Sequence, residues 1–452
     1  MSVKLSRVIL FGPLAWLLAL GALGAVAWIV DDDDPTADFS RIQPAINVAV
    51  NMDVVQVRCG LYPENIVMKN GVSVIGQGAG CTILDGGRAG TVVTFVGIRR
   101  RPALGIPPTE FSGFTVRNGR SSQGGGMFIS DSDPIITHSV IIGNEALRTP
   151  SGYYGVGGGI ALTDSAPIVS NNLIVGNSAE RTGGGVDMYF SYPMLSNNTI
   201  IGNRAVQPGS GYGYGGGAYA LFSDPMLQSN VIVDNSAEGG GGGIDLINSS
   251  ATRIEYTDTF GNVPLNISGA FVAGPGNISQ DPLFVDAGSL DVCPRSHSPA
   301  IDTGLPTGSQ FLTDLFSRPR HVDGDFDGPL GNGARIDMGA CEGGDITRLM
   351  VDAGGTVSWD PSVGRGAVFN LYRGVLSALR SSCATACVYT QDPAAVPGAS
   401  RQCGLASPGF TDLDVPPLGG AYYYLATGER ALEGVLGFRA DGSVMTNDNP
   451  CP

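Results

Sequence analysis

Residues 157–177 read GGGIALTDSAPIVSNNLIVGN, and residues 183–203 repeat the pattern as GGGVDMYFSYPMLSNNTIIGN. Further glycine triplets of this kind begin at Gly124, Gly215 and, in a degenerate copy, Gly241. Each triplet is followed at a nearly constant distance by an asparagine, and these are Asn144, Asn177, Asn203, Asn235 and Asn262. A period of this length is typical of a stacked repeat architecture.

Apolar residues alternate with variable ones inside each copy, in short runs separated by Gly, Pro and Asn. This period of two predicts about three short strands per copy, with one face turned inward. One inward column is isoleucine in four copies, at Ile141, Ile174, Ile200 and Ile232. Because such strands cannot bury their apolar face alone, the copies must stack. The pattern therefore predicts a right-handed parallel β-helix with stacked asparagine ladders.

Two copies are separated from the next by longer segments, EALRTPSGYYGV (145–156) and RAVQPGSGYGY (204–214). The repeat itself keeps its length, so we expect these two inserts to project from one edge of the solenoid, two coils apart. Exposed aromatic residues stack on sugar rings or anchor protein contacts. The aromatic candidates for binding are therefore Tyr153, Tyr154, Tyr212 and Tyr214 in the inserts, and Phe128, Tyr189 and Tyr219 at outward strand positions. The alternative is that the glycine- and tyrosine-rich loops fold back on the solenoid.

Composition narrows the class of protein. Glycine accounts for 68 of 452 residues, which argues against a helix-rich chain. The formal net charge is −15. An acidic surface of this kind argues against nucleic acid and against anionic membranes as partners.

The first residues, MSVKLSRVILFGPLAWLLALGALGAVAWIV, combine a basic start (Lys4, Arg7) with an apolar run, and residues 25–27 read AVA. This arrangement predicts a signal peptide over 1–27, with Trp28 as the mature N-terminus. The alternative is an uncleaved anchor, because the apolar run is long enough to span a bilayer. In either case the rest of the chain is exported to the medium or the cell surface, with periplasm and outer membrane as alternatives.

Eight cysteines in an exported chain favour disulfides over a metal site, because paired C-x-x-C knuckles are absent. Cys59 and Cys81 are the pair that we expect to bond, since their separation is close to one coil. The connectivity of the others stays open.

The segment SRIQPAINVAVNMDVVQVRCGLYPENIVMKNGVSVIGQGAGCTILDG (40–86) resembles the entry coils of pectinesterase-like and other exported bacterial β-helix proteins, in which a short helix caps the first turn. The triplet-plus-Asn copies resemble polymorphic outer membrane protein repeats. Residues 281–304 and 334–342 resemble the segment that closes such helices. The resemblance implies a pectin-lyase-like β-helix over 28–345.

The composition changes after residue 345. GTVSWDPSVGRGAVFNLYRG (355–374) and the segment 409–437 resemble a fibronectin type III-like β-sandwich, which this likeness places at 346–452. It implies that Trp359 is the core tryptophan of an early strand, and that Tyr422 or Tyr424 makes the tyrosine-corner contact. The whole chain is thus expected to be all-β, with the solenoid followed by a small sandwich with a cysteine-rich insertion.

Catalytic motifs are scarce. Enzymes with this fold that act on acidic polysaccharides need carboxylate pairs or a carboxylate with Arg or Lys, and Lys is absent from 124–262. Asp187 and Asp245 share one outward column two coils apart, which is at the upper limit for an inverting pair. We expect a solvated strand face there, so no catalytic residue is assigned. Both aspartates remain candidate binding residues.

The stretch DGDFDG places Asp323, Asp325 and Asp327 at alternate positions, as in the first half of a calcium loop, but Ala334 stands where the bidentate glutamate belongs. Structural Ca²⁺ and a plain acidic turn therefore both remain open, and no other cofactor is expected. We predict a non-catalytic exported binding or structural module whose partner is an extracellular polysaccharide or a cell-surface protein. The alternative is a lyase or hydrolase that acts on an acidic glycan.

Overall fold

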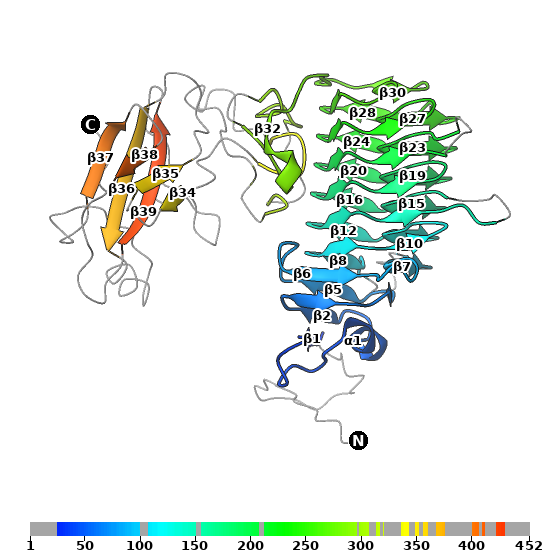
Figure 1. Ribbon diagram of the computed structural model, residues 1–452. Helices are drawn as coiled ribbons and strands as arrows, with labels where there is room; N and C mark the ends of the chain where they lie inside the picture. The colour runs from blue at the N-terminus through cyan, green and yellow to red at the C-terminus, as the bar shows by residue number, and fades with distance from the viewer. Residues whose placement is uncertain are drawn as a thin grey trace, which may run out of the picture.

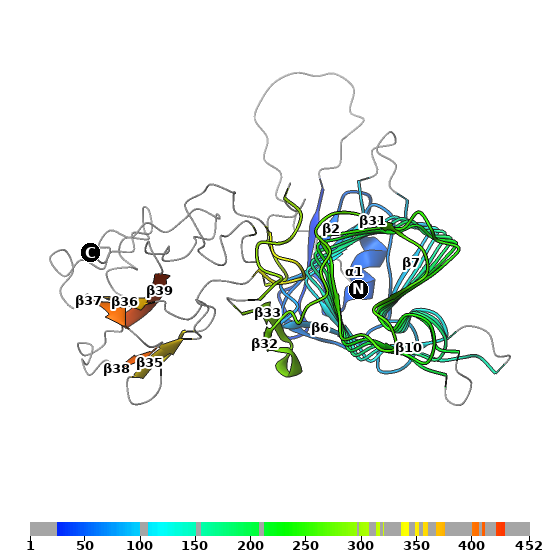
Figure 2. The same ribbon diagram turned by 90° about the horizontal axis from the view of Figure 1, so that it is seen from above.

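The computed structural model describes residues 25–99, 107–150, 155–207, 212–295, 298–306, 313–316, 320 and 336–342, and beyond these only the backbone of strands β34 to β39. Over 27–273 the chain winds as a solenoid of stacked coils (Figure 1). Viewed along the solenoid, successive coils superimpose (Figure 2). Among the described residues, no helix is long and apolar enough to cross a membrane.

The coils form four parallel sheets, here called A to D. Along each repeat the chain passes through a strand of sheet A, then one of sheet B, then one of sheet D and finally one of sheet C. Sheet A contains β1 (Ala27–Val30), β2 (Val54–Val57), β5 (Ser73–Gly76), β8 (Glu110–Ser112), β12 (Ile135–Thr137), β16 (Ile168–Ser170), β20 (Met194–Ser196), β24 (Met226–Gln228), β28 (Arg253–Glu255) and β31 (Val272–Ala273). Sheet B contains β3 (Gly60–Tyr62), β6 (Thr82–Asp85), β9 (Thr115–Arg117), β13 (Val140–Ile142), β17 (Leu173–Val175), β21 (Thr199–Ile201), β25 (Val231–Val233) and β29 (Asp258–Phe260).

Sheet C contains β4 (Ile66–Val67), β7 (Val93–Val96), β11 (Met127–Ser130), β15 (Ile160–Thr163), β19 (Val186–Tyr189), β23 (Ala218–Leu221), β27 (Ile244–Ile247) and β30 (Ile267–Ser268). Sheet D contains the two-residue strands β10 (Arg120–Ser121), β14 (Glu145–Ala146), β18 (Ser178–Ala179), β22 (Arg204–Ala205) and β26 (Ser236–Ala237). Three strands per copy were expected from the sequence. The repeats also carry the short sheet D strand, whose two residues are too few to show an alternation.

Stacked apolar columns fill the interior as the sequence predicts. Ile174 pairs with Ile141 on one side and Ile200 on the other, and Ile200 pairs with Ile232. All four side chains are fully buried. The neighbouring columns from sheets A and C complete one continuous core.

Asparagine ladders line two of the turns. In the ladder after sheet B, the Nδ2 atoms of Asn144, Asn177, Asn203 and Asn235 each donate to Oδ1 of the asparagine one coil further on, the last being Asn262. A second ladder, Asn172–Asn198–Asn230, follows sheet A. These buried amides satisfy one another and the backbone, which fixes the register between coils.

Helix α1 (Ile42–Val48) covers the N-terminal end of the core, and buries Ile42, Ala45 and Ile46. Its first N–H groups donate to the Glu64 carboxylate, at 2.8 Å from Ile42 and 3.1 Å from Gln43. A carboxylate from another coil therefore caps this helix. The short capping helix implied by the resemblance is present.

The described residues of the segment 282–342 do not close the end of the solenoid, as the resemblance implies, but lie along the outer face of sheet B. This lateral segment includes β32 (Phe284–Asp286), the 3₁₀ helix η2 (Ala287–Ser289) and β33 (Asp291–Pro294). Val292, Leu315 and Met338 pack on outward apolar residues of sheet B such as Leu173 and Val231. The outward side of sheet B is apolar, so its cover has to run beside the coils rather than across their end.

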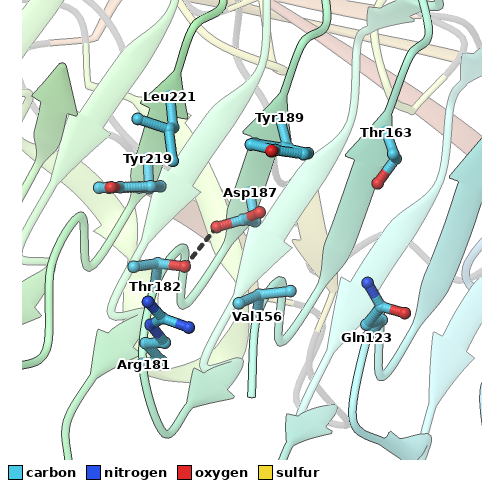
Figure 3. A pocket seen from close by; sticks show the side chains of 9 residues that line it. All are labelled: Gln123, Val156, Thr163, Arg181, Thr182, Asp187, Tyr189, Tyr219 and Leu221. Atoms are coloured by element: carbon cyan, nitrogen blue, oxygen red, sulfur yellow. Dashed lines mark hydrogen bonds between the residues drawn. The ribbon is translucent and has the colours of Figure 1, made fainter. Parts of the chain in front are cut away.

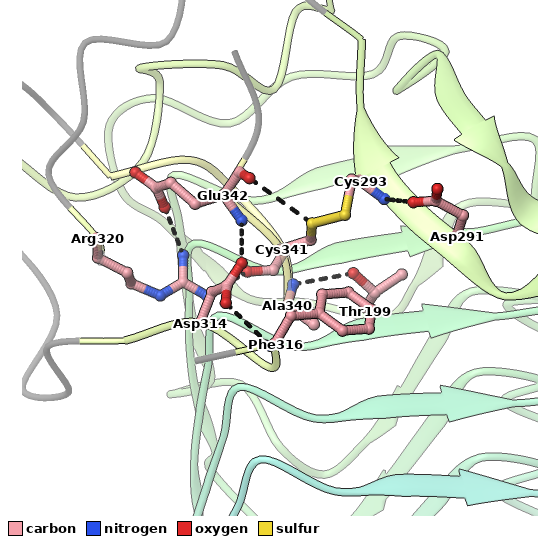
Figure 4. Close-up of a disulfide and its surroundings, with 10 residues drawn as sticks. Thr199, Asp291, Cys293, Asp314, Phe316, Arg320, Ala340, Cys341 and Glu342 are labelled. Carbon is pink, nitrogen blue, oxygen red and sulfur yellow. Dashed lines mark hydrogen bonds and ion pairs between the residues drawn. A yellow bond between two sulfur atoms is a disulfide. The ribbon is translucent and has the colours of Figure 1, made fainter. Parts of the chain in front are cut away.

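Two disulfides and a buried ion pair cross-link the described residues of the solenoid and of the lateral segment. Cys59 bonds to Cys81, as predicted, and Cys293 bonds to Cys341 within the lateral segment (Figure 4). Beside the second bridge, Arg320 pairs with Glu342 at 3.0 Å and donates to Asn171 Oδ1 at 2.7 Å.

Two three-stranded antiparallel sheets lie in the C-terminal part. One contains β34 (Leu349–Val351), β35 (Thr356–Trp359) and β38 (Gly409–Thr411). The other contains β36 (Val368–Val375), β37 (Ser400–Leu405) and β39 (Tyr422–Glu429). Trp359 lies on β35, and Tyr422 and Tyr424 lie on β39. The fibronectin type III-like identity of this part stays a prediction.

Candidate functional site

A hollow of about 290 Å³ lies on the outer face of sheet C (Figure 3). Strands β15, β19 and β23 form its floor, and the linkers that lead from sheet D into sheet C form its edge. Its lining residues are Gln123, Val156, Thr163, Arg181, Thr182, Asp187, Tyr189, Tyr219 and Leu221.

The register of sheet C explains why these side chains meet. Asp187 pairs with Tyr219, and Tyr219 pairs with Asp245. The two aspartates therefore share one outward column two coils apart, as their spacing predicts. Tyr189 and Leu221 stand opposite each other two residues further along the same strands.

The expectation of a solvated face at this column is wrong. Asp187 and Asp245 are only 5% and 1% exposed. Thr182, from the linker before β19, donates from Oγ1 to Asp187 Oδ1 at 2.5 Å. The turn before β27 covers Asp245, whose Oδ2 accepts from the Gly241 N–H at 3.0 Å. The linkers between sheets D and C thus fold over the column.

Glycine at 240 makes this cover possible. Gly240 has φ of +61°, and a Cβ there would lie 1.6 Å from Asp245 Oδ2. The backbone therefore passes directly against the carboxylate, and Asp245 does not line the hollow. Asp187 is the carboxyl group that the hollow contains.

Burial changes the proton affinity of the site. It raises the pKa of Asp187 to about 7, against the lowering effects of the Thr182 hydroxyl and the Arg181 charge. Burial, reinforced by the two aspartates, also raises the pKa of Tyr219 to about 12. At neutral pH Asp187 therefore exists in both protonation states, so it can donate or accept a hydrogen bond or a proton.

The aromatic candidates occupy different environments. Tyr189 is 41% exposed and Tyr219 is half-buried, and both line the hollow. Phe128 is half-buried in the Asp187 column, where it pairs with Ala161, but it does not line the hollow. Tyr212 is 60% exposed, and Tyr214 is half-buried beside Thr182.

Five candidate residues lie outside the described residues, namely Tyr153 and Tyr154 of the first insert and the calcium candidates Asp323, Asp325 and Asp327. Within the described part of the chain, Asp31, Asp32 and Asp33 are the acids close enough together to hold an ion. Arg58 already pairs with Asp31 at 3.1 Å and with Asp34 at 2.7 Å, so that cluster has its own cation.

The residues that form the edge of the hollow were not predicted from the sequence. Gln123, Val156, Thr182 and Tyr214 each directly precede the first glycine of a triplet, and they pair in one column. The repeat alignment contains this column. Its residues vary from copy to copy, however, and the sequence does not show that they turn toward the strands.

Residues 66–259 match the protein family described as "Right handed beta helix region". The chain contains a right-handed parallel β-helix. No curated protein matches the sequence.

Solved structures similar to the β-helix include a pectin methylesterase in complex with a hexasaccharide, which is 10% identical, with 51% of this chain and 78% of that chain covered and a TM-score of 0.33. The pectin methylesterase PemA from Erwinia chrysanthemi is 11% identical, with 52% and 78% covered and a TM-score of 0.32. At this identity and TM-score, nothing about activity follows from them.

Proposed function

We propose that the β-helix binds a polysaccharide chain in the hollow of sheet C, as a non-catalytic module exported from the cell. Two disulfides and the β-helix fold are consistent with an extracellular protein. The outer face of sheet B is covered by the lateral segment, whereas the outer face of sheet C is hollowed and lined by polar and aromatic side chains.

The observation that carries the proposal is the placement of Tyr189 and Tyr219 around Asp187 in one hollow (Figure 3). A sugar ring has an apolar C–H face and a rim of hydroxyls. Tyrosine rings offer flat apolar surfaces to the first, and Asp187, Arg181 and Gln123 offer hydrogen bonds to the second. A site of this kind suits an uncharged hydroxylated ligand better than a purely apolar one.

The geometry favours binding over glycoside hydrolysis. Hydrolysis of a glycosidic bond uses two carboxyl groups that both reach the substrate. Of the two aspartates in the column, only Asp187 lines the hollow, because the Gly240–Gly241 turn covers Asp245.

One observation favours catalysis as the second candidate. The pKa of Asp187 is raised to about 7 beside the Arg181 guanidinium, and a group with this pKa transfers protons well at neutral pH. In that case the chain is a polysaccharide-active enzyme, with Asp187 as its acid or base.

An experiment with the purified chain separates the two. Tyr189→Ala and Tyr219→Ala are tested for retention on immobilised polysaccharides, with Phe260→Ala, an exposed aromatic on sheet B, as the matched control. We expect the first two to weaken binding about tenfold or more and the control to bind as wild type. Wild-type retention on no polysaccharide, or equal retention of all variants, contradicts the proposal. Product release by wild type but not by Asp187→Asn supports the enzyme.

The second insert extends the same edge through Tyr214. Tyr214 pairs with Thr182 in the edge column, and Tyr212 precedes it with an exposed side chain. If the inserts contribute to binding, replacing Tyr153, Tyr154, Tyr212 and Tyr214 by Ala weakens retention by at least about 2 kcal/mol and changes stability by no more than about 1 kcal/mol. Unfolding of this variant shows instead that the tyrosines are packing residues.

A further inference from the structure

The turn from sheet C to sheet A places one residue per coil in the left-handed region. The φ angles at this position are +50° at Asp131, +51° at Asp164, +46° at Phe190, +50° at Phe222 and +52° at Asn248. Asp and Asn tolerate this conformation, but a bulky side chain there is a genuine outlier. Two coils therefore carry a phenylalanine where the backbone favours Asp or Asn, and the fold itself gives no reason for it.

The two rings form an ordered pair at the surface. Phe190 stacks on Phe222 with ring centroids 5.1 Å apart and an interplanar angle of 11°. Each residue is 42% exposed. Tyr189 packs edge-on against Phe190 at 4.5 Å, and Tyr192 is 59% exposed two residues further on. We call Tyr189, Phe190, Tyr192 and Phe222 the aromatic platform.

The platform is continuous with the hollow. Tyr189 lines the hollow and contacts Phe190, and Leu221 lines it directly before Phe222. A ligand chain that leaves the hollow over Tyr189 therefore meets exposed aromatic rings next, on the same two coils.

We propose that the aromatic platform forms additional subsites for a long, neutral polysaccharide whose first units occupy the hollow. This proposal rests on the proposed function and names its ligand class. The rings offer apolar faces to the C–H groups of successive sugars. Arg181 is the cationic side chain that lines the hollow, beside Asp187. Asp164 and Asp224 lie on the platform's own turn column and coil, and Arg99, which donates to the Asp164 carbonyl, is already paired with Asp131 and Asp133. This acidic surrounding disfavours a polyuronate and leaves an uncharged glycan as the fitting ligand.

The repeat supplies the test variant. Asn248 holds the same turn position in another coil, so Phe190→Asn with Phe222→Asn removes the rings and keeps the left-handed backbone. Binding of a disaccharide and of a long oligomer is measured for soluble neutral oligosaccharides of glucose, mannose and xylose, with an oligogalacturonide as the acidic comparison. We expect the wild type to bind a long neutral oligomer about tenfold tighter than its disaccharide. The double variant should lose that gain, keep the disaccharide affinity, and show an unchanged or higher Tm.

Each other outcome is decisive. Wild-type binding with an unchanged length preference in the double variant overturns the platform and leaves the proposed function standing. No glycan binding by wild type overturns both. Tighter binding of the oligogalacturonide overturns the neutral ligand class. A change of oligomeric state in the double variant, measured by light scattering, without a change in glycan affinity assigns the platform to a protein contact. Tyr192→Ala, which matches Ala166 in the preceding coil, is a second variant that leaves the turn itself untouched.

Discussion

The side-chain amide of Asn177 donates to the side-chain oxygen of Asn203 at 3.0 Å, and the backbone N–H of Asn177 donates to the same oxygen at 3.0 Å. Asn203 in turn donates to Asn235 Oδ1 and to the Ile174 carbonyl. One buried amide thus joins three consecutive coils, and its neighbours in the ladder do the same.

Replacing Asn203 by Ala should be strongly destabilising. The change removes four hydrogen bonds. It leaves the buried Asn177 N–H and the Ile174 carbonyl without the Asn203 side chain as partner, whereas Asn235 Oδ1 keeps the backbone N–H of residue 203, and the loss costs about 3–5 kcal/mol. Chemical denaturation measures the loss. Asn266→Ala, at the half-buried end of the ladder, is the control and should cost clearly less. Equal losses at both positions contradict a cooperative internal ladder.

Ile200→Asp tests the isoleucine column. Ile200 is fully buried between Ile174 and Ile232, so a carboxylate there has no partner and should cost several kcal/mol. Thermal denaturation and yield of folded protein report the effect. The control is Ile247→Asp on the 41% exposed end of β27, for which we expect a change of about 0.5 kcal/mol.

Asp187 should make stability depend on pH. Its pKa is about 7 in the folded chain and about 3.9 when unfolded, so between these values the folded state holds the extra proton. The free energy of unfolding of wild type therefore falls as pH rises from about 4 to 7, by up to about 4 kcal/mol, and this contribution is constant above pH 7.

Asp187→Asn should remove this decrease in the free energy of unfolding. The variant should therefore become more stable relative to wild type as the pH rises across the same window. Thr182→Val removes a hydrogen bond that lowers the pKa of Asp187, and it should extend the fall to higher pH. Urea denaturation at several pH values compares the three proteins. Parallel profiles for wild type and Asp187→Asn would rule out the buried acid.

Loss of the Cys293–Cys341 bridge should loosen the lateral segment selectively. The bridge spans 48 residues, for which chain entropy predicts a loss of about 4 kcal/mol. Alanine suits both positions, since both side chains are buried. Hydrogen exchange should show faster amide exchange at Met338 and Ala340 and unchanged exchange at the Asn177–Asn203 ladder. Removing Cys59–Cys81 is the control and should affect the N-terminal coils instead.

The export prediction is checked at the N-terminus. Cleavage after Ala27 makes Trp28 the first residue of the mature chain. The structure adds a competing expectation, because the Val26 N–H donates to Asp53 at 2.8 Å and the Val26 carbonyl accepts from Val54. N-terminal sequencing of secreted material decides between Trp28 and an earlier residue, and an intact Met1 in a membrane fraction indicates an anchor.

The solenoid itself could be predicted because its determinants are local and repeated. The Ile200 column and the Asn203 ladder recur at a fixed spacing, so alignment of the copies was enough to place both. The Cys59–Cys81 bridge followed from the same coil length.

The environment of the site could not be predicted in this way. Strand alternation places Asp187 on the outer face, but its burial depends on how the linker with Thr182 folds back. The cover over Asp245 depends on the positive φ of Gly240, and five consecutive glycines do not reveal which one turns the chain. The lateral segment was misplaced because its contacts are long-range: Arg320 meets Asn171 across 149 residues.

The lateral segment also limits how this protein can change in length. It is fastened to the same turn position in four consecutive coils, through His138 to Thr313, Asn171 to Arg320, Asn197 to Asp337, and Ser229 to Gly339. Tandem duplication of one coil is the simplest way for a repeat gene to grow. A duplication between residues 138 and 229 would move some of these attachment points by a whole coil relative to the others. A duplication nearer the N-terminus would keep the spacing of all four attachment points to the lateral segment. We therefore expect the number of coils among descendants of this chain to vary on the N-terminal side and to stay constant in the part that the lateral segment covers.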